Sequence, residues 1–252
     1  MRVDLHINQA LAPVDAVLAC AERADTSGFD AVWVLDHLAS MEPGRNQGQM
    51  LDPHVLLGAI AARTTRVRLG VLVNNVAVRP AAVIAGATAT LDIVSCGRAV
   101  LGLGAGAAPG TYFAAEHDAL ENILEPEMTK RHEALTDSLA RIRNIWAGGN
   151  DRNVVFPRPI GQVPVVVGVN SVALARRAAE ADCGVNVRWN HPALEAILSC
   201  ADPKLGEWAS TVWLPYDPAL TDTSHPTLRH LTGLGVTRTI LLTTSPADIV
   251  NA

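Results

Sequence analysis

The sequence predicts an α/β protein that forms one TIM-type (β/α)8 barrel over residues 1–252. Short β-branched runs alternate with longer Ala/Leu-rich amphipathic segments from end to end, which is typical of βαβ units around a parallel sheet. Eight strand candidates can be counted, and eight-stranded barrels usually have about 250 residues. We find no domain boundary and therefore expect a single domain.

Each strand is expected where an apolar run is nearly continuous, as in strands that are buried on both faces. In chain order, the expected strands are residues 3–8, 31–36, 67–74, 99–105, 163–169, 184–189, 211–216 and 237–243. The long connections 40–51 and 107–124 follow the second and fourth strands. Loops at the carboxyl ends of barrel strands build the active site, so both should line a pocket.

Helices are expected in the amphipathic segments between the strands. They are residues 13–26, 53–64, 80–94, 125–146, 172–181, 192–200 and 227–234. Proline begins several of them, Pro13, Pro53 and Pro80 included, at the first-turn position that it prefers. The rival architecture is an open doubly wound sheet. Its dinucleotide fingerprint fails here, because Gly104-Ala-Gly106 leads into a long loop rather than a helix.

Composition narrows the class of ligand. The net charge is −5, with 49% hydrophobic and 18% charged residues, which argues against disorder and against a nucleic-acid-binding surface. A small-molecule substrate fits better. No apolar run is long enough to span a membrane, and the N-terminus lacks the apolar core of a signal peptide, so we expect a cytoplasmic protein. The four cysteines lack C-x-x-C spacing, which predicts neither a disulfide framework nor a zinc site.

One strand carries glycine at every second residue. Gly102, Gly104 and Gly106 fall on the same side of it, because successive strand side chains point to opposite faces. The bare face could let a flat ligand approach the backbone. Alternatively, the glycines simply weaken or bulge the strand.

The second strand ends in two ionisable residues, Asp36 and His37, at the rim where barrels place their active sites. His37 is the catalytic candidate, because imidazole titrates near neutrality without perturbation. Asp36 could orient His37 or cap a neighbouring loop. The alternative is that both residues only end the strand through local hydrogen bonds.

A possible anion site lies where the fifth strand meets the next helix. Gly168, Val169, Asn170 and Ser171 form this junction. Unpaired N–H groups at a helix start can hold a phosphate, and glycine permits close approach. Ordinary helix capping by Asn or Ser is the alternative.

Asp4 and His6 lie on one face of the first strand and could be metal ligands. The other histidines fall in expected loops or helices, so consistent ligands at further strand ends are lacking and we predict no metal. Asp4 and His6 then form a polar layer inside the barrel or bind the rim of the ligand.

Taken together, the strongest segments resemble the bacterial luciferase-like monooxygenase superfamily, and within it the reductases and dehydrogenases that use the deazaflavin coenzyme F420. The resemblance runs from the first strand to about Asn190. Its best-matching segments are residues 28–37, 65–70, 79–83, 87–106 and 178–186.

The resemblance implies a (β/α)8 barrel that holds F420, or alternatively FMN, in its mouth. A His at the position of His37 would handle a proton near the reactive carbon of the ring. A bulged third strand, often with a non-proline cis peptide, would back the ring at Val71, Leu72, Val73 and Asn74. The ring edge would lie against Gly104, Ala105 and Gly106, and the phosphate against Gly168, Val169, Asn170 and Ser171. Asp36 belongs to the same cofactor-binding set.

Three departures from the family pattern bear on function. The acid that follows Gly-x-Gly in some sugar-phosphate dehydrogenases is replaced by Ala107, which argues against that substrate. Cys96 replaces a turn glycine. The part after Asn190 is shortened, so the pocket is either open or completed by another subunit. The resemblance implies a homodimer, since family members are commonly dimers and the shortened part leaves apolar surface to cover. Alternatives to an F420-dependent oxidoreductase are an FMN-dependent monooxygenase and a non-catalytic cofactor-binding barrel.

Overall fold

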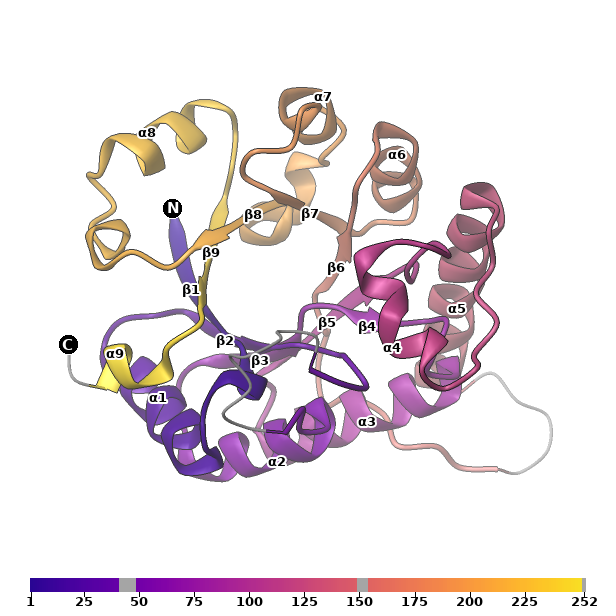
Figure 1. The fold of residues 1–252 in the computed structure, drawn as a ribbon, viewed down its shortest axis with the longest axis horizontal. Helices are drawn as coiled ribbons and strands as arrows, with labels where there is room; N and C mark the ends of the chain where they lie inside the picture. The colour runs from indigo at the N-terminus through magenta and orange to yellow at the C-terminus, as the bar shows by residue number, and fades with distance from the viewer. Residues whose placement is uncertain (41–48, 149–153, 251–252) are drawn as a thin grey trace.

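The computed structural model describes residues 1–40, 49–148 and 154–250, and its strands form a closed parallel barrel surrounded by helices (Figure 1). The strands are β1 (Arg2–Ile7), β2 (Ala31–Val34), β3 (Arg68–Val71), β4 (Asn74–Asn75), β5 (Ala99–Gly104), β6 (Val165–Gly168), β7 (Gly184–Arg188), β8 (Ser210–Pro215) and β9 (Arg238–Thr243). Their order is β3-β2-β1-β9-β8-β7-β6-β5-β4, and a further β3–β5 pairing closes the sheet. The predicted TIM-type barrel is confirmed.

The third barrel strand is split in two, so nine strand segments make up eight barrel positions. β3 pairs with β2 and with the start of β5, whereas β4 pairs with the end of β5 at Leu103 and Gly104. Between them, the Leu72–Val73 peptide bond is cis. The bulge and the cis peptide implied by the family resemblance are therefore confirmed.

The helices follow the predicted segments, usually within a few residues at each end. They are α1 (Val14–Thr26), α2 (Pro53–Arg63), α3 (Ala81–Val94), α5 (Met128–Ala147), α6 (Val172–Glu180), α7 (Leu194–Leu198) and α8 (Pro226–Gly233). Sequence analysis missed the short α4 (Ala115–Asp118) and α9 (Pro246–Val250), and the 3-10 turns η1 (Gln9–Leu11), η2 (Tyr112–Ala114), η3 (Pro203–Trp208) and η4 (Pro218–Thr221). Pro53 opens α2, whereas Pro13 and Pro80 cap α1 and α3 one residue earlier.

The barrel interior has its own apolar cluster, separate from the larger core between strands and helices. Trp33, Val100, Val166, Trp208 and Ile240 are buried within it. A Cβ atom added to Gly70 would lie 2.6 Å from Cζ3 of Trp33, so only glycine at this position leaves room for the indole ring. Large side chains therefore fill the part of the barrel interior that holds this cluster.

An ion pair accompanies this cluster. Arg238 bonds to Asp4, which also accepts a 2.8 Å hydrogen bond from Nε1 of Trp33. The guanidinium of Arg238 lies 3.9 Å from the ring centroid of Trp208. Burial raises the pKa of Asp4 to about 6, although Arg238 and Trp33 oppose the shift. The polar layer predicted for Asp4 is confirmed.

The glycine-rich face of β5 meets protein rather than open space. A Cβ atom at Gly102 would collide with the carbonyl oxygen of Val71, and one at Gly104 would collide with Cγ2 of Val73. The expected ligand slot is therefore wrong for Gly102, because the third strand fills that side. Gly104 still reaches the cavity described below, but its missing side chain makes room for Val73.

The turn between α3 and β5 contains Cys96, which adopts a φ of 56°. This left-handed conformation favours glycine, consistent with the family having glycine there. The cysteine changes the side chain and retains the turn.

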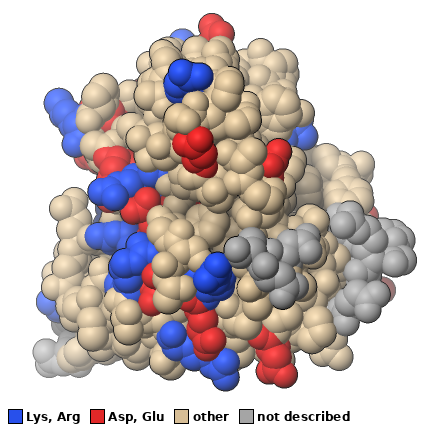
Figure 2. Space-filling view, turned by 90° about the vertical axis from the view of Figure 1, so that its left-hand side faces the viewer, with Lys and Arg blue, Asp and Glu red and all other residues tan. Residues whose placement is uncertain are grey.

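The distribution of charged side chains on the surface agrees with the small net charge of the sequence. Figure 2 shows acidic and basic side chains side by side on one face, without a continuous basic stripe there. In the part of the chain that the structure describes, no helix is long and apolar enough to cross a membrane.

Candidate active site

A cavity of about 520 Å³ opens at the carboxyl ends of the strands, the rim where TIM barrels place their active sites. Its volume lies in the range of small-molecule sites. Of the predicted site residues, Asp36, His37, Leu72, Val73, Gly104, Ala105, Gly106, Gly168, Val169 and Asn170 line it. Both predicted loops also contribute, through Ser40 and Met50 on one side and through Ala107, Tyr112, Phe113 and Glu116 on the other. Residues 41–48 of the first loop lie outside the described residues.

Three predicted site residues do not line the cavity. Val71 belongs to the core between strands and helices. The buried Asn74 donates from Nδ2 to the carbonyl oxygen of Gly102 at 2.9 Å, which ties β4 to β5. Ser171 caps α6 by accepting a 3.3 Å hydrogen bond from the backbone of Leu174. Val71, Asn74 and Ser171 therefore contribute packing and hydrogen bonds within the protein.

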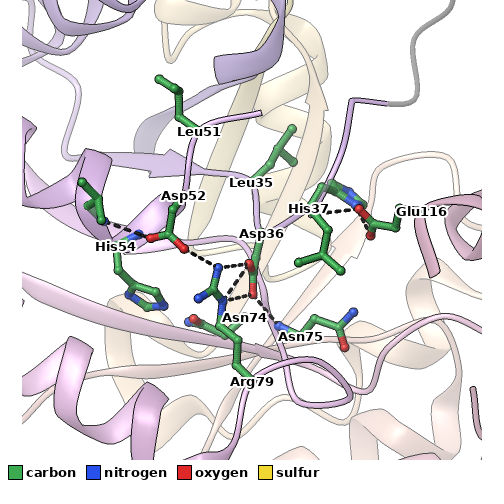
Figure 3. Close-up of polar contacts among 12 residues, drawn as sticks. Leu35, Asp36, His37, Leu51, Asp52, His54, Asn74, Asn75, Arg79 and Glu116 are labelled. Carbon is green, nitrogen blue, oxygen red and sulfur yellow. Dashed lines mark hydrogen bonds and ion pairs between the residues drawn. The ribbon is translucent and has the colours of Figure 1, made fainter. Parts of the chain in front are cut away.

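Asp36 fixes the loop after β4. Among the described residues, its side chain makes no hydrogen bond or ion pair with the side chain of His37. Its carboxylate accepts hydrogen bonds from Nε of Arg79 at 2.9 and 3.0 Å, and from the backbone of Asn75 at 3.0 Å (Figure 3). Arg79 also pairs with Asp52 at 2.8 Å. Partial burial lowers the pKa of Arg79, but these carboxylates outweigh it and raise the pKa overall. Of the two predicted roles for Asp36, the structure supports loop capping.

His37 is held by Glu116, which sequence reasoning missed. Nδ1 of His37 lies 2.9 Å from Oε1 of Glu116 (Figure 3). Oε2 of the same carboxylate accepts hydrogen bonds from the backbone of Leu38 at 2.6 Å and Ala39 at 3.1 Å. The ring of Phe113 stacks on that of His37 at 5.8 Å. Glu116 comes from α4, in the loop after β5, and is only 4% exposed.

This arrangement defines the chemistry open to His37. An ionised carboxylate only accepts hydrogen bonds, so the Nδ1 atom that faces it carries a hydrogen. In the neutral ring, Nε2 is then the free acceptor, and it has no hydrogen-bond partner among the described residues. His37 can therefore accept or return a proton through Nε2 at the cavity wall.

The start of α6 also faces the cavity. Gly168, Val169 and Asn170 line it just before the Ser171 cap. The backbone N–H groups of Val172 and Ala173 have no acceptor among the described residues, and they are the groups that bind anions at helix starts. The capping interpretation is confirmed for Ser171, and the anion site remains a prediction.

No metal centre is apparent in the described part of the chain, where no three His, Cys, Asp or Glu side chains group as metal ligands. His6, which the rejected metal hypothesis paired with Asp4, belongs to the lining of the same cavity.

The fold and the site define a TIM barrel with a cavity at its mouth and a histidine, His37, in the cavity wall. Comparison with known proteins gives the family. Luciferase-like monooxygenases match over residues 1–196, and the chain belongs to this family. An F420-dependent glucose-6-phosphate dehydrogenase of Nakamurella multipartita is 33% identical over 171 residues, which cover 63% of this chain and 47% of the relative.

A second relative is the 5,10-methylenetetrahydromethanopterin reductase of Methanolobus tindarius. It is 30% identical over 189 residues, or 71% of this chain and 52% of the reductase. The chain thus spans about half the length of the curated relatives it matches.

Solved structures share the fold. The monooxygenase RslO1 of Streptomyces bottropensis aligns with a TM-score of 0.74 at 19% identity, covering 100% of this chain and 97% of its own. The coenzyme F420 dependent tetrahydromethanopterin reductase of Methanopyrus kandleri aligns with a TM-score of 0.73 at 17% identity, covering 99% and 97%.

Proposed function

We propose that the protein is an oxidoreductase that transfers a hydride between coenzyme F420 and a small organic substrate. The observation that carries the proposal is His37, which lies at the wall of the cavity with Nδ1 held by Glu116. Its Nε2 has no hydrogen-bond partner among the residues that the structure describes. Relatives about one-third identical are named as F420-dependent dehydrogenases, which supports this choice of cofactor.

The cavity residues fit such a cofactor. Leu72 and Val73 give it an apolar wall at the break in the third strand, suited to one face of a planar ring. The start of α6, after Gly168, offers backbone N–H groups to a phosphate. When bound, F420 would supply the hydride acceptor or donor.

The protein's own part is to position the ligands and handle a proton. His37 would take the proton from a substrate hydroxyl through Nε2, or return it to a carbonyl in the reverse direction. Glu116 would keep Nδ1 protonated and the ring aimed at the cavity. Stacking on Phe113 restricts the same ring.

A titration against both candidate cofactors tests the proposal. We expect F420 to bind and quench the protein's tryptophan fluorescence, with FMN binding at least tenfold more weakly. His37→Asn should lower kcat by about 10²-fold, a typical loss for a general acid–base group, while the Kd for F420 stays within about threefold. His230→Asn, on the exposed face of α8, is the matched control. Tight FMN binding without F420 binding would overturn the choice of cofactor.

An FMN-dependent monooxygenase is the second candidate, favoured by the description of the matching family. A non-catalytic cofactor-binding barrel is the third. Retained F420 binding without turnover over a broad panel of electron donors and acceptors would favour the third.

Sugar phosphates are poor substrate candidates for this cavity. Ala107 lines it where some sugar-phosphate dehydrogenases have an acid, and among the described lining residues there is no Lys or Arg. Arg79, close behind the wall, is engaged by Asp36 and Asp52.

We also propose a cytoplasmic homodimer. All four cysteines are free thiols, in keeping with a reducing compartment. Apolar side chains are exposed on neighbouring helices, among them Val55 on α2 and Val83 on α3. Light scattering should give twice the mass of one chain, and a monomeric mass at working concentration would contradict this part of the proposal.

A further inference from the structure

His6 differs from Asp4 and Asn186, two other polar residues inside the barrel, in the hydrogen bonding of its side chain. It lies on β1, is 4% exposed and lines the cavity. Neither Nδ1 nor Nε2 has a hydrogen-bond partner among the described residues. By contrast, Asp4 on the same face is paired with Arg238 and Trp33, and Nδ2 of Asn186 donates to Oγ1 of Thr211 at 2.8 Å.

An unsatisfied buried imidazole is unfavourable in the free protein. Buried polar groups in native proteins are nearly always hydrogen-bonded, and each exception calls for an explanation. Here the explanation lies in the cavity. Both ring nitrogens are shielded from solvent, but the ring belongs to the cavity lining, so a turn of the ring would let a ligand in the cavity supply the missing partner.

The charge of the site limits what that partner can be. Burial lowers the pKa of His6 to about 3, and His37 acts in the same direction, so the ring is neutral near pH 7. One nitrogen then donates and the other accepts. No Lys or Arg is among the described residues that line the cavity, whereas Asp36 and Glu116 are. At His6, such surroundings favour an uncharged hydrogen-bonding group over an anion, whereas the start of α6 is where the cavity offers N–H groups to a phosphate.

We propose that His6 is a recognition subsite for an uncharged hydroxyl or carbonyl group of the ligand. Trp213 and Leu242 line the same cavity and would contact the carbon atoms next to that group. The subsite deepens the proposed function and rests on it, because it takes this cavity as the reaction site. The hydroxyl or carbonyl could belong to the substrate or to the polar edge of the deazaflavin ring.

Nitrogen NMR of ¹⁵N-histidine-labelled protein separates these two sources. The His6 resonances are assigned by their loss in His6→Gln. The protein is titrated with F420 alone, and then with cyclohexanol or cyclohexanone, each with and without F420. We expect the His6 ring nitrogens to shift by several ppm. A shift with F420 alone assigns the subsite to the ring, and a shift only with the alcohol or ketone assigns it to the substrate.

Variants give a second readout. His6→Leu keeps similar bulk but removes both polar atoms, and we expect an unchanged or higher Tm because no unsatisfied group is left. If the substrate is the source, kcat/KM for cyclohexanol should fall 10- to 100-fold, with partial recovery in His6→Gln and an unchanged Kd for F420. If the ring is the source, that Kd should rise about tenfold. His230→Leu, at an exposed position, should change neither.

The outcomes separate the subsite from the proposed function. Failure of F420 to bind would contradict the proposed function, yet a His6 shift with cyclohexanol or cyclohexanone in the free protein would still support the subsite. His6 resonances that move with none of these ligands, together with wild-type constants in His6→Leu, would overturn the subsite even if F420 binds.

Discussion

Single residues shape the candidate site, and they differ in how far the sequence reveals them. The place of His37 at the cavity wall could be predicted, because a histidine at the end of a barrel strand lies at the rim where active sites form. The residue that holds His37, Glu116, could not be predicted. Glu116 lies 79 positions further along the chain, and no local pattern distinguishes it from the other acids in its loop. The expectation that loop 107–124 lines the pocket was the only signal that could have led to it.

Replacing Glu116 tests whether it positions His37. In Glu116→Gln the amide NH₂ can donate to Nδ1, which favours the opposite tautomer, with the hydrogen on Nε2. We expect kcat to fall by about 10- to 100-fold with KM little changed, and the pH–rate profile to shift. Histidine ¹⁵N shifts should report the changed tautomer directly.

Asp118→Asn is the matched control for this experiment, because Asp118 belongs to the same short helix but is exposed. Wild-type kcat in Glu116→Gln, together with an unchanged His37 tautomer, would show that the carboxylate only binds the Leu38 and Ala39 backbone.

The neutral His6 should make folding stability depend on pH. The pKa of His6 is about 3 in the folded protein and 6.5 when exposed, so between these values the unfolded chain binds a proton that the folded protein does not. Stability therefore rises with pH across this range. Relative to His6→Gln, the wild type should lose about 2 kcal/mol of unfolding free energy between pH 7 and pH 5.

Urea denaturation at the two pH values measures this difference. His230→Gln serves as the reference, because its side chain is exposed and its replacement should leave the pH dependence as in wild type. If unfolding free energy changes with pH equally in wild type and His6→Gln, the folded protein binds a proton at His6 as the unfolded chain does. That result would contradict a neutral, buried His6.

At the scale of elements, periodicity and composition predicted the strands well and their packing poorly. All eight barrel strands occur where apolar runs indicated them, because burial on both faces leaves a clear local pattern. What lies against the glycine face of β5 depends on the neighbouring third strand. Local sequence shows only that one face is bare, whereas the structure shows Val71 and Val73 filling that side.

The fit between β5 and the third strand can be measured by a double-mutant cycle. In Gly104→Ala the new methyl group would collide with Cγ2 of Val73, and such overpacking typically destabilises by about 1–3 kcal/mol. Val73→Ala removes the colliding methyl group. Adding Gly104→Ala to Val73→Ala should therefore cost less than adding it to wild type, with a coupling energy of about 0.5 kcal/mol or more.

Gly58→Ala provides the comparison for this cycle. Gly58 lies in α2, and a Cβ atom there would meet nothing within 4 Å, so the substitution should be neutral or stabilise by up to about 1 kcal/mol. Additive effects of Val73→Ala and Gly104→Ala would mean that the two strands do not depend on this contact.

At the scale of the whole molecule, contacts between distant parts of the chain close the barrel and form the floor of its cavity. Asp4 and Arg238 are 234 positions apart, and β1 and β9 pair along their full lengths. The sequence suggested a polar layer from Asp4 and His6 but could not separate their roles. Arg238 and Trp33 satisfy Asp4, whereas His6, two residues further along β1, lies above this layer and meets the cavity.

Because strands from both ends of the chain meet at this cavity, a ligand bound there should stabilise the barrel as a unit. A ligand that binds only the folded state at 100 times its Kd contributes about 2.7 kcal/mol. For a domain of this size, each kcal/mol raises Tm by roughly 2–4 °C. Saturating F420 should therefore raise Tm by about 5–10 °C in one cooperative transition, followed by circular dichroism while the F420 concentration is varied. FMN at the same concentration should raise Tm by less, and a Tm that F420 leaves unchanged would contradict binding in this cavity.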